Sequence, residues 1–183
     1  MPRVSTVGHS NRSLEEFVRI LKGYGIERVI DVRRFPVSRK WPHFNAVELA
    51  RGLAESRIAY AGLPEAGGRR RPRPDSPHGA WRVDAFRGYA DFMDTQEFER
   101  VLETAQALAR EKASALMCAE ALVWRCHRSL LGDAFVARGW EVSDILSEKE
   151  ARPHRLPEFA RLEGERIVYD GSSDRDFQEP FPN

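Results

Sequence analysis

The sequence contains little cysteine and no long apolar run. Cys118 and Cys126 are the only cysteines among 183 residues, which is too few for the disulfide framework of a small secreted domain. No stretch approaches the roughly 20 apolar residues that a membrane-spanning helix needs, and the opening residues do not resemble a secretory signal. We therefore expect a cytoplasmic protein that has no membrane partner.

An excess of charge of either sign is also missing. The chain has 29 Lys and Arg against 28 Asp and Glu, so its net charge is +1, and 42% of its residues are hydrophobic. This composition is typical of one ordinary globular domain. Arginine is nevertheless concentrated within residues 33–40 and 69–73 and around Arg125 and Arg128. These clusters indicate an anionic partner, either a small molecule or a nucleic acid. The sequence predicts no cofactor and no particular oligomeric state.

Strand-like and helix-like segments alternate along most of the chain. The pattern predicts strands at residues 4–7, 28–33, 58–63, 113–118 and 140–145, and helices at 14–21, 47–53, 86–93, 96–110 and 129–137. Three of the helices have an N-terminal capping signal, formed by Ser13 with Glu16, Asn45 with Glu48, and Asp94 with Glu97. The alternation predicts an α/β fold, a single domain with a mostly parallel sheet flanked by helices.

Two segments lack this regular pattern. Residues 64–82 are rich in Gly, Pro and Arg and predict a long mobile loop, in which Trp81 is expected to be exposed, as at an interface. The α/β domain is expected to span residues 1–156. Residues 157–183 then form a C-terminal extension, with a small edge strand at 166–169 and a frayed tail.

The segment from Met117 to Ser129, MCAEALVWRCHRS, concentrates chemically reactive groups between a predicted strand and a predicted helix. A helix that begins near Cys126 or His127 directs free backbone N–H groups and a partial positive charge into the turn, which favours an anion. Arg125 and Arg128 can add bidentate contacts. The same charges lower the pKa of a nearby thiol. Cys118 is therefore a candidate nucleophile, although it could instead simply pack at the strand end.

The same segment contains zinc-ligand residue types, but their spacing does not predict a zinc site. Thiolates and imidazoles are the usual zinc ligands, but structural sites have ligand pairs separated by two to four residues. Cys118 stands alone, and Cys126 and His127 are adjacent.

Polar side chains follow three of the predicted strands. His9 follows the first strand, Asp31 and Arg33 end the second, and Glu120 follows the fourth. Because the carboxyl ends of parallel strands lie at one edge of a sheet, these groups should converge on one crevice. They would provide an acid or base, a carboxylate and a cation. The alternative for Asp31 is a structural carboxylate held by loop N–H groups, and for His9 a histidine satisfied within its turn.

Cations alternate with aromatic side chains in the segment RRFPVSRKWPHFN, residues 33–45. This interleaving suits phosphates together with stacked bases. The arginine-rich run at 69–73 is a candidate flexible clamp over the same crevice, although a charged loop can also be merely solvated.

The chain resembles the domain-of-unknown-function family 488 across nearly its whole length to about Leu156. The resemblance rests on residues 6–11, Asp31-Val32-Arg33 with Pro36, Ser38-Arg39, Phe44-Asn45, Leu63-Pro64 with Gly67-Gly68, Arg87-Gly88-Tyr89, Met117 to Glu120, and Cys126-His127-Arg128. It implies an α/β fold and carries no settled activity. A weaker resemblance to rhodanese-type domains rests on Asp31-Val32-Arg33, Cys118, Arg128-Ser129 and residues 139–142, but the segment from Cys118 to Arg128 is longer than a sulfur-transfer loop.

These observations favour an enzyme, a hydrolase or a transferase, that acts on an anionic substrate resembling a nucleotide or nucleic acid in a basic crevice at the strand ends. The alternatives are a nucleic-acid-binding module without catalysis and a sulfurtransferase-like thiol enzyme. The candidate catalytic residues are His9, Asp31, Cys118 and Glu120. The candidate substrate-binding residues are Ser10, Asn11, Arg33, Ser38, Arg39, Asn45, Arg125, Cys126, His127 and Arg128.

Overall fold

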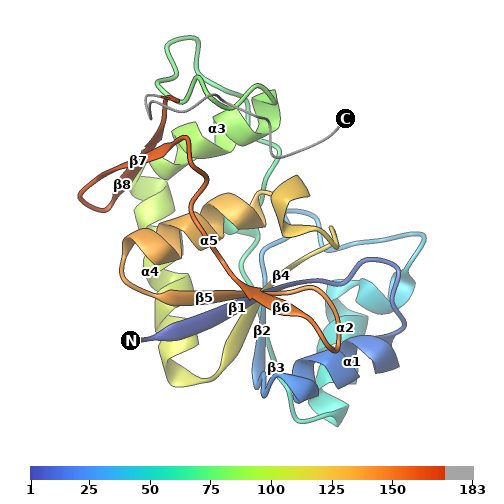
Figure 1. Ribbon diagram of the computed structural model, residues 1–183. Helices are drawn as coiled ribbons and strands as arrows, with labels where there is room; N and C mark the ends of the chain where they lie inside the picture. Colours follow the sequence, from blue (N-terminus) through green and yellow to red (C-terminus); the bar gives the residue numbers. More distant parts are fainter. Residues whose placement is uncertain (172–183) are drawn as a thin grey trace.

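Six strands form one sheet in the order β3-β2-β4-β1-β5-β6 (Figure 1). The computed structural model describes residues 1–171. The first five strands are parallel, and the last pairs antiparallel with β5 at one edge. Their bounds are β1 (Arg3–Gly8), β2 (Arg28–Asp31), β3 (Ala59–Gly62), β4 (Ser114–Cys118), β5 (Glu141–Ile145) and β6 (Ala151–Pro153). The predicted α/β fold with a mostly parallel sheet is confirmed.

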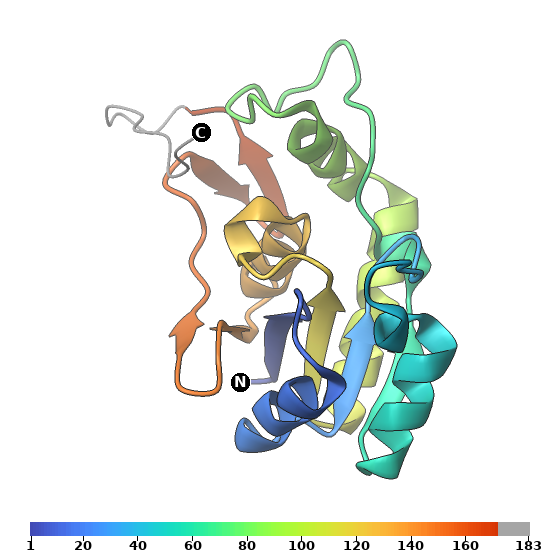
Figure 2. The ribbon, with the colours of Figure 1, turned by 90° about the vertical axis from the view of Figure 1, so that its right-hand side faces the viewer.

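Helices cover both faces of this sheet (Figures 1 and 2). One face is covered by α1 (Leu14–Gly23) and α2 (Ala46–Glu55), and the other lies on the side of α3 (Asp84–Met93), α4 (Gln96–Glu111) and α5 (Arg128–Ala137). Three single helical turns, η1 (Pro42–Phe44), η2 (Pro64–Ala66) and η3 (Val123–Arg125), lie in the connections. No helix among residues 1–171 is long and apolar enough to cross a membrane.

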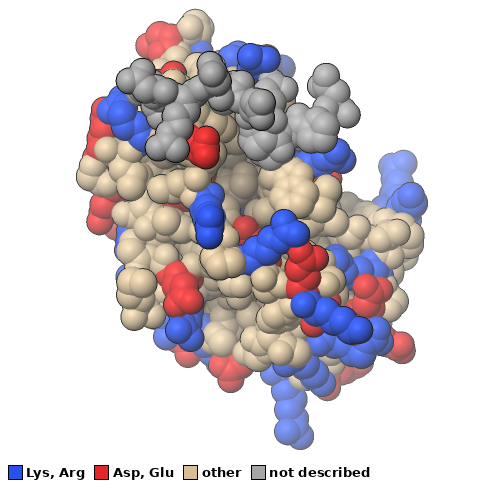
Figure 3. Space-filling view, in the orientation of Figure 1, with Lys and Arg blue, Asp and Glu red and all other residues tan. Residues whose placement is uncertain are grey.

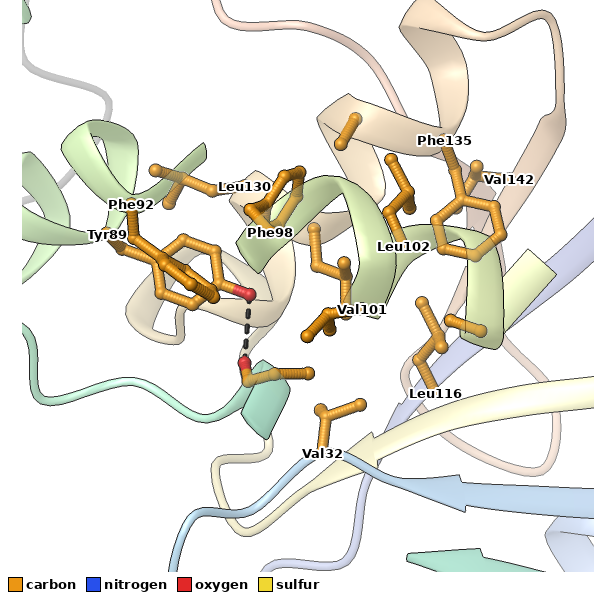
Figure 4. Close-up of a cluster of buried hydrophobic side chains, with 14 of the residues drawn as sticks. Val32, Tyr89, Phe92, Phe98, Val101, Leu102, Leu116, Leu130, Phe135 and Val142 are labelled. Carbon is orange, nitrogen blue, oxygen red and sulfur yellow. Dashed lines mark hydrogen bonds between the residues drawn. The ribbon is translucent and has the colours of Figure 1, made fainter. Parts of the chain in front are cut away.

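Alternating strand residues contribute to two separate cores. Val29 and Met117 pack with α1 and α2, whereas their neighbours Ile30 and Leu116 pack with the helices of the opposite face. Figure 4 shows the second core, in which side chains of α4 lie over the sheet and the Tyr89 hydroxyl donates to the carbonyl of Ala66 over 2.9 Å. Burial of each large apolar side chain contributes about 1.5–3 kcal/mol, so these two cores fix the strand ends in place.

The N-terminal signals of the helices were predicted correctly in one case of three. The Ser13 hydroxyl accepts a hydrogen bond from the backbone N–H of Glu16, as expected for the start of α1. Asn45 does precede α2, but its side chain accepts instead from the backbone N–H of Ser38 and does not cap the helix. The prediction of Asp94 as the cap of α4 is wrong, because Thr95 occupies that position.

The arginine-rich loop contains no strand and no helix from residue 67 to 83, yet it packs against the domain at several points. The Arg70 guanidinium lies 3.3 Å from the ring centre of Phe92, and the backbone N–H of Arg73 donates to Asp91 over 2.7 Å. Trp81 is only 6% exposed. The prediction that Trp81 lies exposed at an interface is therefore wrong, because its ring joins the aromatic residues under the C-terminal hairpin.

The C-terminal segment forms a hairpin of its own, with β7 (Ala160–Glu163) antiparallel to β8 (Arg166–Tyr169). The predicted strand at 166–169 therefore exists. It was predicted as an edge strand, but among residues 1–171 its strand partner is β7, so it is not part of the main sheet. Ile167 and Tyr169 are buried in the same core as α4 and α5. The predicted frayed tail lies outside the described residues.

A buried polar network ties this hairpin to the sheet. The ring of His154 lies between two carboxylates, with Nδ1 at 2.8 Å from Asp144 and Nε2 at 2.9 Å from Asp133. The Tyr169 hydroxyl also donates to Asp133, over 2.8 Å. Burial alone would lower the pKa of His154, but its hydrogen bonds to the two carboxylates raise it to about 10. His154 is therefore a buried cation at neutral pH.

Candidate active site

The end of β4 lies at a crevice in the sheet. β4 is placed between β2 and β1, and the helices that follow these two neighbours cover one face, whereas α5, which follows β4, covers the other. In open α/β sheets, ligands bind outside the carboxyl ends of strands at points where successive connections leave on opposite faces. Here the connections leave on opposite faces both between β4 and β1 and between β4 and β2, so the binding position predicted by this rule is the end of β4, at Cys118.

The loops after β1 and β4 stay in contact beyond the strands. The backbone N–H groups of His9 and Ser10 donate to the carbonyls of Cys118 and Ala119, each over 3.0 Å. A Cβ on Gly8 would lie 1.9 Å from the carbonyl oxygen of Glu120. Only glycine fits there, because the Glu120 backbone crosses directly over it. This close approach holds Glu120 beside the strand ends.

Asp31 and Arg33 form a buried ion pair at the end of β2. One carboxylate oxygen of Asp31 accepts from Arg33 Nε over 2.8 Å, and the other accepts from Arg33 Nη2 over 2.6 Å. The second oxygen also accepts from the Tyr60 hydroxyl over 2.8 Å. Asp31 is 1% exposed and Arg33 is 8% exposed. Both carboxylate oxygens are thus used to fix one guanidinium.

His9 completes this cluster. Its Nε2 lies 3.2 Å from Arg33 Nη1 and its Nδ1 lies 2.9 Å from the Ser10 carbonyl, while its ring stacks on Phe44 with centroids 4.0 Å apart. Since a guanidinium can only donate, Nε2 must be the acceptor and Nδ1 must carry the proton. Burial lowers the pKa of His9 to about 4. His9 is therefore neutral, and both ring nitrogens hold neighbouring groups in position.

Arg128 faces inward, toward the end of β4. It is 1% exposed, and its Nη1 donates to the Val7 carbonyl over 2.7 Å and to Cys118 Sγ over 3.0 Å. Burial opposes ionisation of Cys118, but hydrogen bonding with Cys126, the Arg128 charge and the contact with the Glu120 backbone together lower its pKa to about 7. A substantial share of Cys118 is therefore thiolate at neutral pH.

Cys126 and His127 lie beside this thiol. Hydrogen bonding with Cys118 and burial raise the pKa of Cys126, so Cys126 stays protonated at neutral pH. Burial lowers the pKa of His127 to about 4. Its Nε2 lies 3.2 Å from the Val32 carbonyl and its Nδ1 lies 3.5 Å from Cys126 Sγ. Because a carbonyl can only accept, Nε2 of the neutral ring carries the proton and Nδ1 can accept from the Cys126 thiol. The pKa values of the two thiols are thus shifted in opposite directions, down for Cys118 and up for Cys126.

Two adjoining hollows lie over these groups. The first hollow, of about 440 Å³, is lined by Arg33, Arg34, Phe35, Gly68, Arg69, Ala85, Phe86, Cys118, Ala119, Glu120, Arg125, Cys126 and His127. Cys118 lies in its wall and is only 3% exposed. The second hollow, of about 450 Å³, is lined by His9, Ser10, Asn11, Arg33, Phe35, Val37, Ser38, Lys40, Trp41, Arg69, Ala119, Glu120 and Ala121. Since they share Arg33, Phe35, Arg69, Ala119 and Glu120, we refer to the two together as the groove.

The groove is more strongly positive than the protein as a whole, whose net charge is only +1. Figure 3 shows basic and acidic side chains interspersed over one face of the molecule. The groove, by contrast, is lined by several arginines and one lysine against a single carboxylate, that of Glu120. Two residues of its wall, Ser10 and Arg69, have φ angles of 51° and 63°. Such left-handed backbone costs non-glycine residues on the order of 1–3 kcal/mol and is common at functional sites.

Most predicted site residues lie at the groove, but their positions differ. His9, Ser10, Asn11, Arg33, Ser38, Cys118, Glu120, Arg125, Cys126 and His127 line it. Asp31 and Arg128 are buried behind it, where Asp31 holds Arg33 and Arg128 holds backbone carbonyls and Cys118. Asn45 fixes the loop through Ser38. Arg39 is exposed and lines neither hollow.

Several residues of the site were not predicted individually. Arg34 and Lys40 were visible only as part of a cationic run, and Phe86 only as part of a helix. Tyr60 was missed altogether, because its contact with Asp31 depends on the pairing of β2 with β3. Of the 69–73 run, only Arg69 lines the groove, since Arg70 and Arg73 contact Phe92 and Asp91. Among residues 1–171, no group of three or more His, Cys, Asp or Glu is arranged to hold a metal ion.

Comparison with known proteins identifies the family. The model of the domain of unknown function DUF488 matches residues 13–135, more than half of the chain. The chain belongs to the DUF488 family. No curated protein and no solved structure matches it. These comparisons do not show the likeness to rhodanese-type domains that the sequence suggested.

The DUF488 match is shorter than the expected resemblance, which covered nearly the whole length of the chain to about Leu156. It includes Asp31, Arg33, Cys118 and Glu120. It leaves out His9, Ser10 and Asn11, which wall the second hollow. The family match therefore covers the thiol and its surroundings and leaves the loop after β1 outside.

Proposed function

We propose that this DUF488 protein is an enzyme that acts on a phosphate ester of a nucleotide or nucleic acid, with Cys118 as its nucleophile. The observation that carries the proposal is the position of Cys118: its sulfur accepts an N–H of Arg128 over 3.0 Å, and the residue, buried at the end of β4, lines the basic first hollow. A cation in contact with sulfur stabilises the thiolate, which is the nucleophilic form.

The residues around the thiol support a division of roles. The Arg33 guanidinium uses four of its five N–H groups on Asp31, Phe44 and His9, which leaves one to contact a phosphate oxygen. Arg34 and Arg125 line the same hollow. His9 and Asp31 are positioning residues in this proposal, because every polar atom of their side chains already contacts a neighbour.

The proposed reaction has two steps. The Cys118 thiolate forms a bond to phosphorus while the bond from phosphorus to the leaving oxygen breaks, and the leaving group departs with that electron pair. A water molecule then attacks the phosphorus, the Glu120 carboxylate accepts its proton, and the sulfur leaves as thiolate. With water as acceptor the enzyme is a hydrolase, and with an alcohol in the same place it is a transferase.

Turnover of bis(p-nitrophenyl) phosphate, a chromogenic phosphodiester, tests this proposal. We expect Cys118→Ser to abolish p-nitrophenol release and Glu120→Gln to lower kcat at least about 100-fold, with KM changed less than about tenfold. The matched control is Glu103→Gln, an exposed carboxylate on α4 outside the groove, which should behave as wild type. Full turnover by Cys118→Ser would overturn the role of the thiol.

Alkylation by iodoacetamide provides a second test that needs no substrate. Peptide mass spectrometry should find Cys118 labelled first, with a rate that is half-maximal near pH 7, the pKa given by its surroundings. Inorganic phosphate should slow this labelling by occupying the first hollow. A midpoint of the labelling rate near pH 9, the ordinary thiol range, would contradict the proposal. So would a labelling rate that inorganic phosphate does not change.

A further inference from the structure

Phe35 stands out among the large apolar side chains because it is 63% exposed and lies between two cations. The guanidinium carbons of Arg34 and Arg69 lie 5.8 Å and 5.9 Å from its ring centre. Arg34 is its neighbour in the chain, but Arg69 comes from a different loop. The ring packs in neither hydrophobic core, so stability of the fold does not explain its position.

Phe35 also lies where the two hollows meet, since it lines both of them. Each hollow, at about 440 Å³ and 450 Å³, is within the range of roughly 300–1,000 Å³ that accommodates a small ligand. A mononucleotide over Cys118 would occupy the first hollow and leave the second empty. The size and continuity of the groove therefore suit a ligand with more than one repeating unit.

The second hollow is equipped for binding and not for the proposed chemistry. It is lined by a second aromatic side chain, Trp41, with the Lys40 ammonium 5.3 Å from its ring centre. Ser10 and Asn11 supply polar groups from the loop after β1, and no thiol lines it. An aromatic ring beside a cation thus occurs in both hollows, which matches the repeat of base and phosphate along a polynucleotide.

Ring faces that are open to solvent select for unpaired bases, and of the two rings Phe35 is exposed and Trp41 is half-buried. Stacking on an aromatic side chain needs an open base face, and successive bases of a single strand stack on such rings while cations follow the phosphates. In a duplex these faces are covered by neighbouring base pairs. The groove also contains arginines from three loops, those after β2 and β4 and the 67–83 loop, which suits a flexible backbone more than a straight one.

We propose that the groove binds single-stranded nucleic acid across at least two nucleotides, with bases on Phe35 and Trp41. This inference rests on the proposed function, because it names the substrate class of the same site. One phosphate lies at Arg33, between the hollows, and the ester that reacts lies over Cys118 in the first hollow. The nucleotide in the second hollow contributes affinity and position only.

Fluorescence anisotropy with a labelled ten-nucleotide oligothymidylate tests the proposal on the full chain. Phe35→Ala and Trp41→Ala should each weaken binding at least about fivefold, the lower end of the loss for one stacked base. The matched control is Val47→Ala, which removes an apolar side chain that is 79% exposed on α2 and lines neither hollow. A duplex of the same length should bind at least tenfold more weakly, and thymidine monophosphate should compete poorly.

Affinity that stays within twofold in both aromatic variants, or equal binding of duplex and single strand, would overturn this inference. The proposed function would survive that result, because bis(p-nitrophenyl) phosphate is too small to need the second hollow and its turnover tests the chemistry of Cys118 and Glu120. Conversely, loss of oligonucleotide binding in Phe35→Ala together with full turnover by Cys118→Ser would support the single-strand groove and exclude the thiol mechanism. Each of the two proposals can therefore be refuted while the other is retained.

Discussion

Replacing Asp31 by asparagine should destabilise the protein severely, because it leaves Arg33 buried without its counter-charge. Asp31 and Arg33 are 1% and 8% exposed and are joined by contacts of 2.6 Å and 2.8 Å. Removing one partner of a buried ion pair costs about 3–5 kcal/mol. For a chain of this size, each kcal/mol lowers Tm by roughly 2–4 °C. We therefore expect Tm to fall by about 6–20 °C.

Burial, and not the length of the contact, is the reason for this magnitude. Arg3 and Glu141 form a pair at the same distance of 2.8 Å, but their side chains are 78% and 53% exposed. Surface pairs contribute about 0–1 kcal/mol, so Glu141→Gln should be nearly neutral. Tyr60→Phe removes one hydrogen bond to Asp31 and should cost about 0.5–1.5 kcal/mol.

Urea unfolding followed by tryptophan fluorescence, with the free energy extrapolated to water, would measure all three variants. The order of losses should be Asp31→Asn, then Tyr60→Phe, then Glu141→Gln. A loss below about 1 kcal/mol for Asp31→Asn would refute the reasoning, and so would an equal loss for Glu141→Gln. The first result would mean that Arg33 does not depend on a fixed counter-charge, which would weaken its assignment as the phosphate contact between the hollows. The second would mean that burial does not set the strength of these pairs.

Two further predictions concern the folded state. The raised pKa of His154, about 10 against an ordinary 6.5, means that its charge stabilises the fold fully below pH 6.5 and progressively less as pH rises to 10. Urea unfolding should therefore show the gap between wild type and His154→Gln shrinking from pH 6.5 to 9.5, and a constant gap would contradict this. Gly8→Ala places a methyl group 1.9 Å from the Glu120 carbonyl and should cost at least about 3 kcal/mol. The control Gly23→Ala has nothing within 4 Å and should be neutral or stabilising by up to about 1 kcal/mol in the same assay.

The strand ends could be predicted from the sequence because local signals define them. Short β-branched runs are followed by polar turns, and parallel strands bring those turns to one edge, so the convergence of His9, Asp31 and Cys118 followed from chain order alone. The strand order could not be predicted in the same way. β4 inserts between β2 and β1, and that choice depends on how the two cores pack.

Side-chain direction was the part of the site that the sequence could not provide. Arg128 looked like an anion contact, but it is buried against the carbonyl of Val7 and the sulfur of Cys118. An arginine is mostly exposed in proteins unless it is paired, so an inward direction depends on acceptors that become visible only in the fold. Trp81 and the Asn45 side chain were mispredicted for the same reason, since their partners are distant in sequence or lie in irregular backbone.

The two edges of the sheet have a consequence for how copies of this chain can associate. At one edge, β6 is three residues long and ends in Pro153, which has no backbone N–H to donate to a strand of another molecule. At the other edge, β3 is only four residues long. Short edge strands and proline in an edge strand are common features that prevent two sheets from pairing edge to edge. Extension of the main sheet from one molecule to the next is thus disfavoured at these two edges.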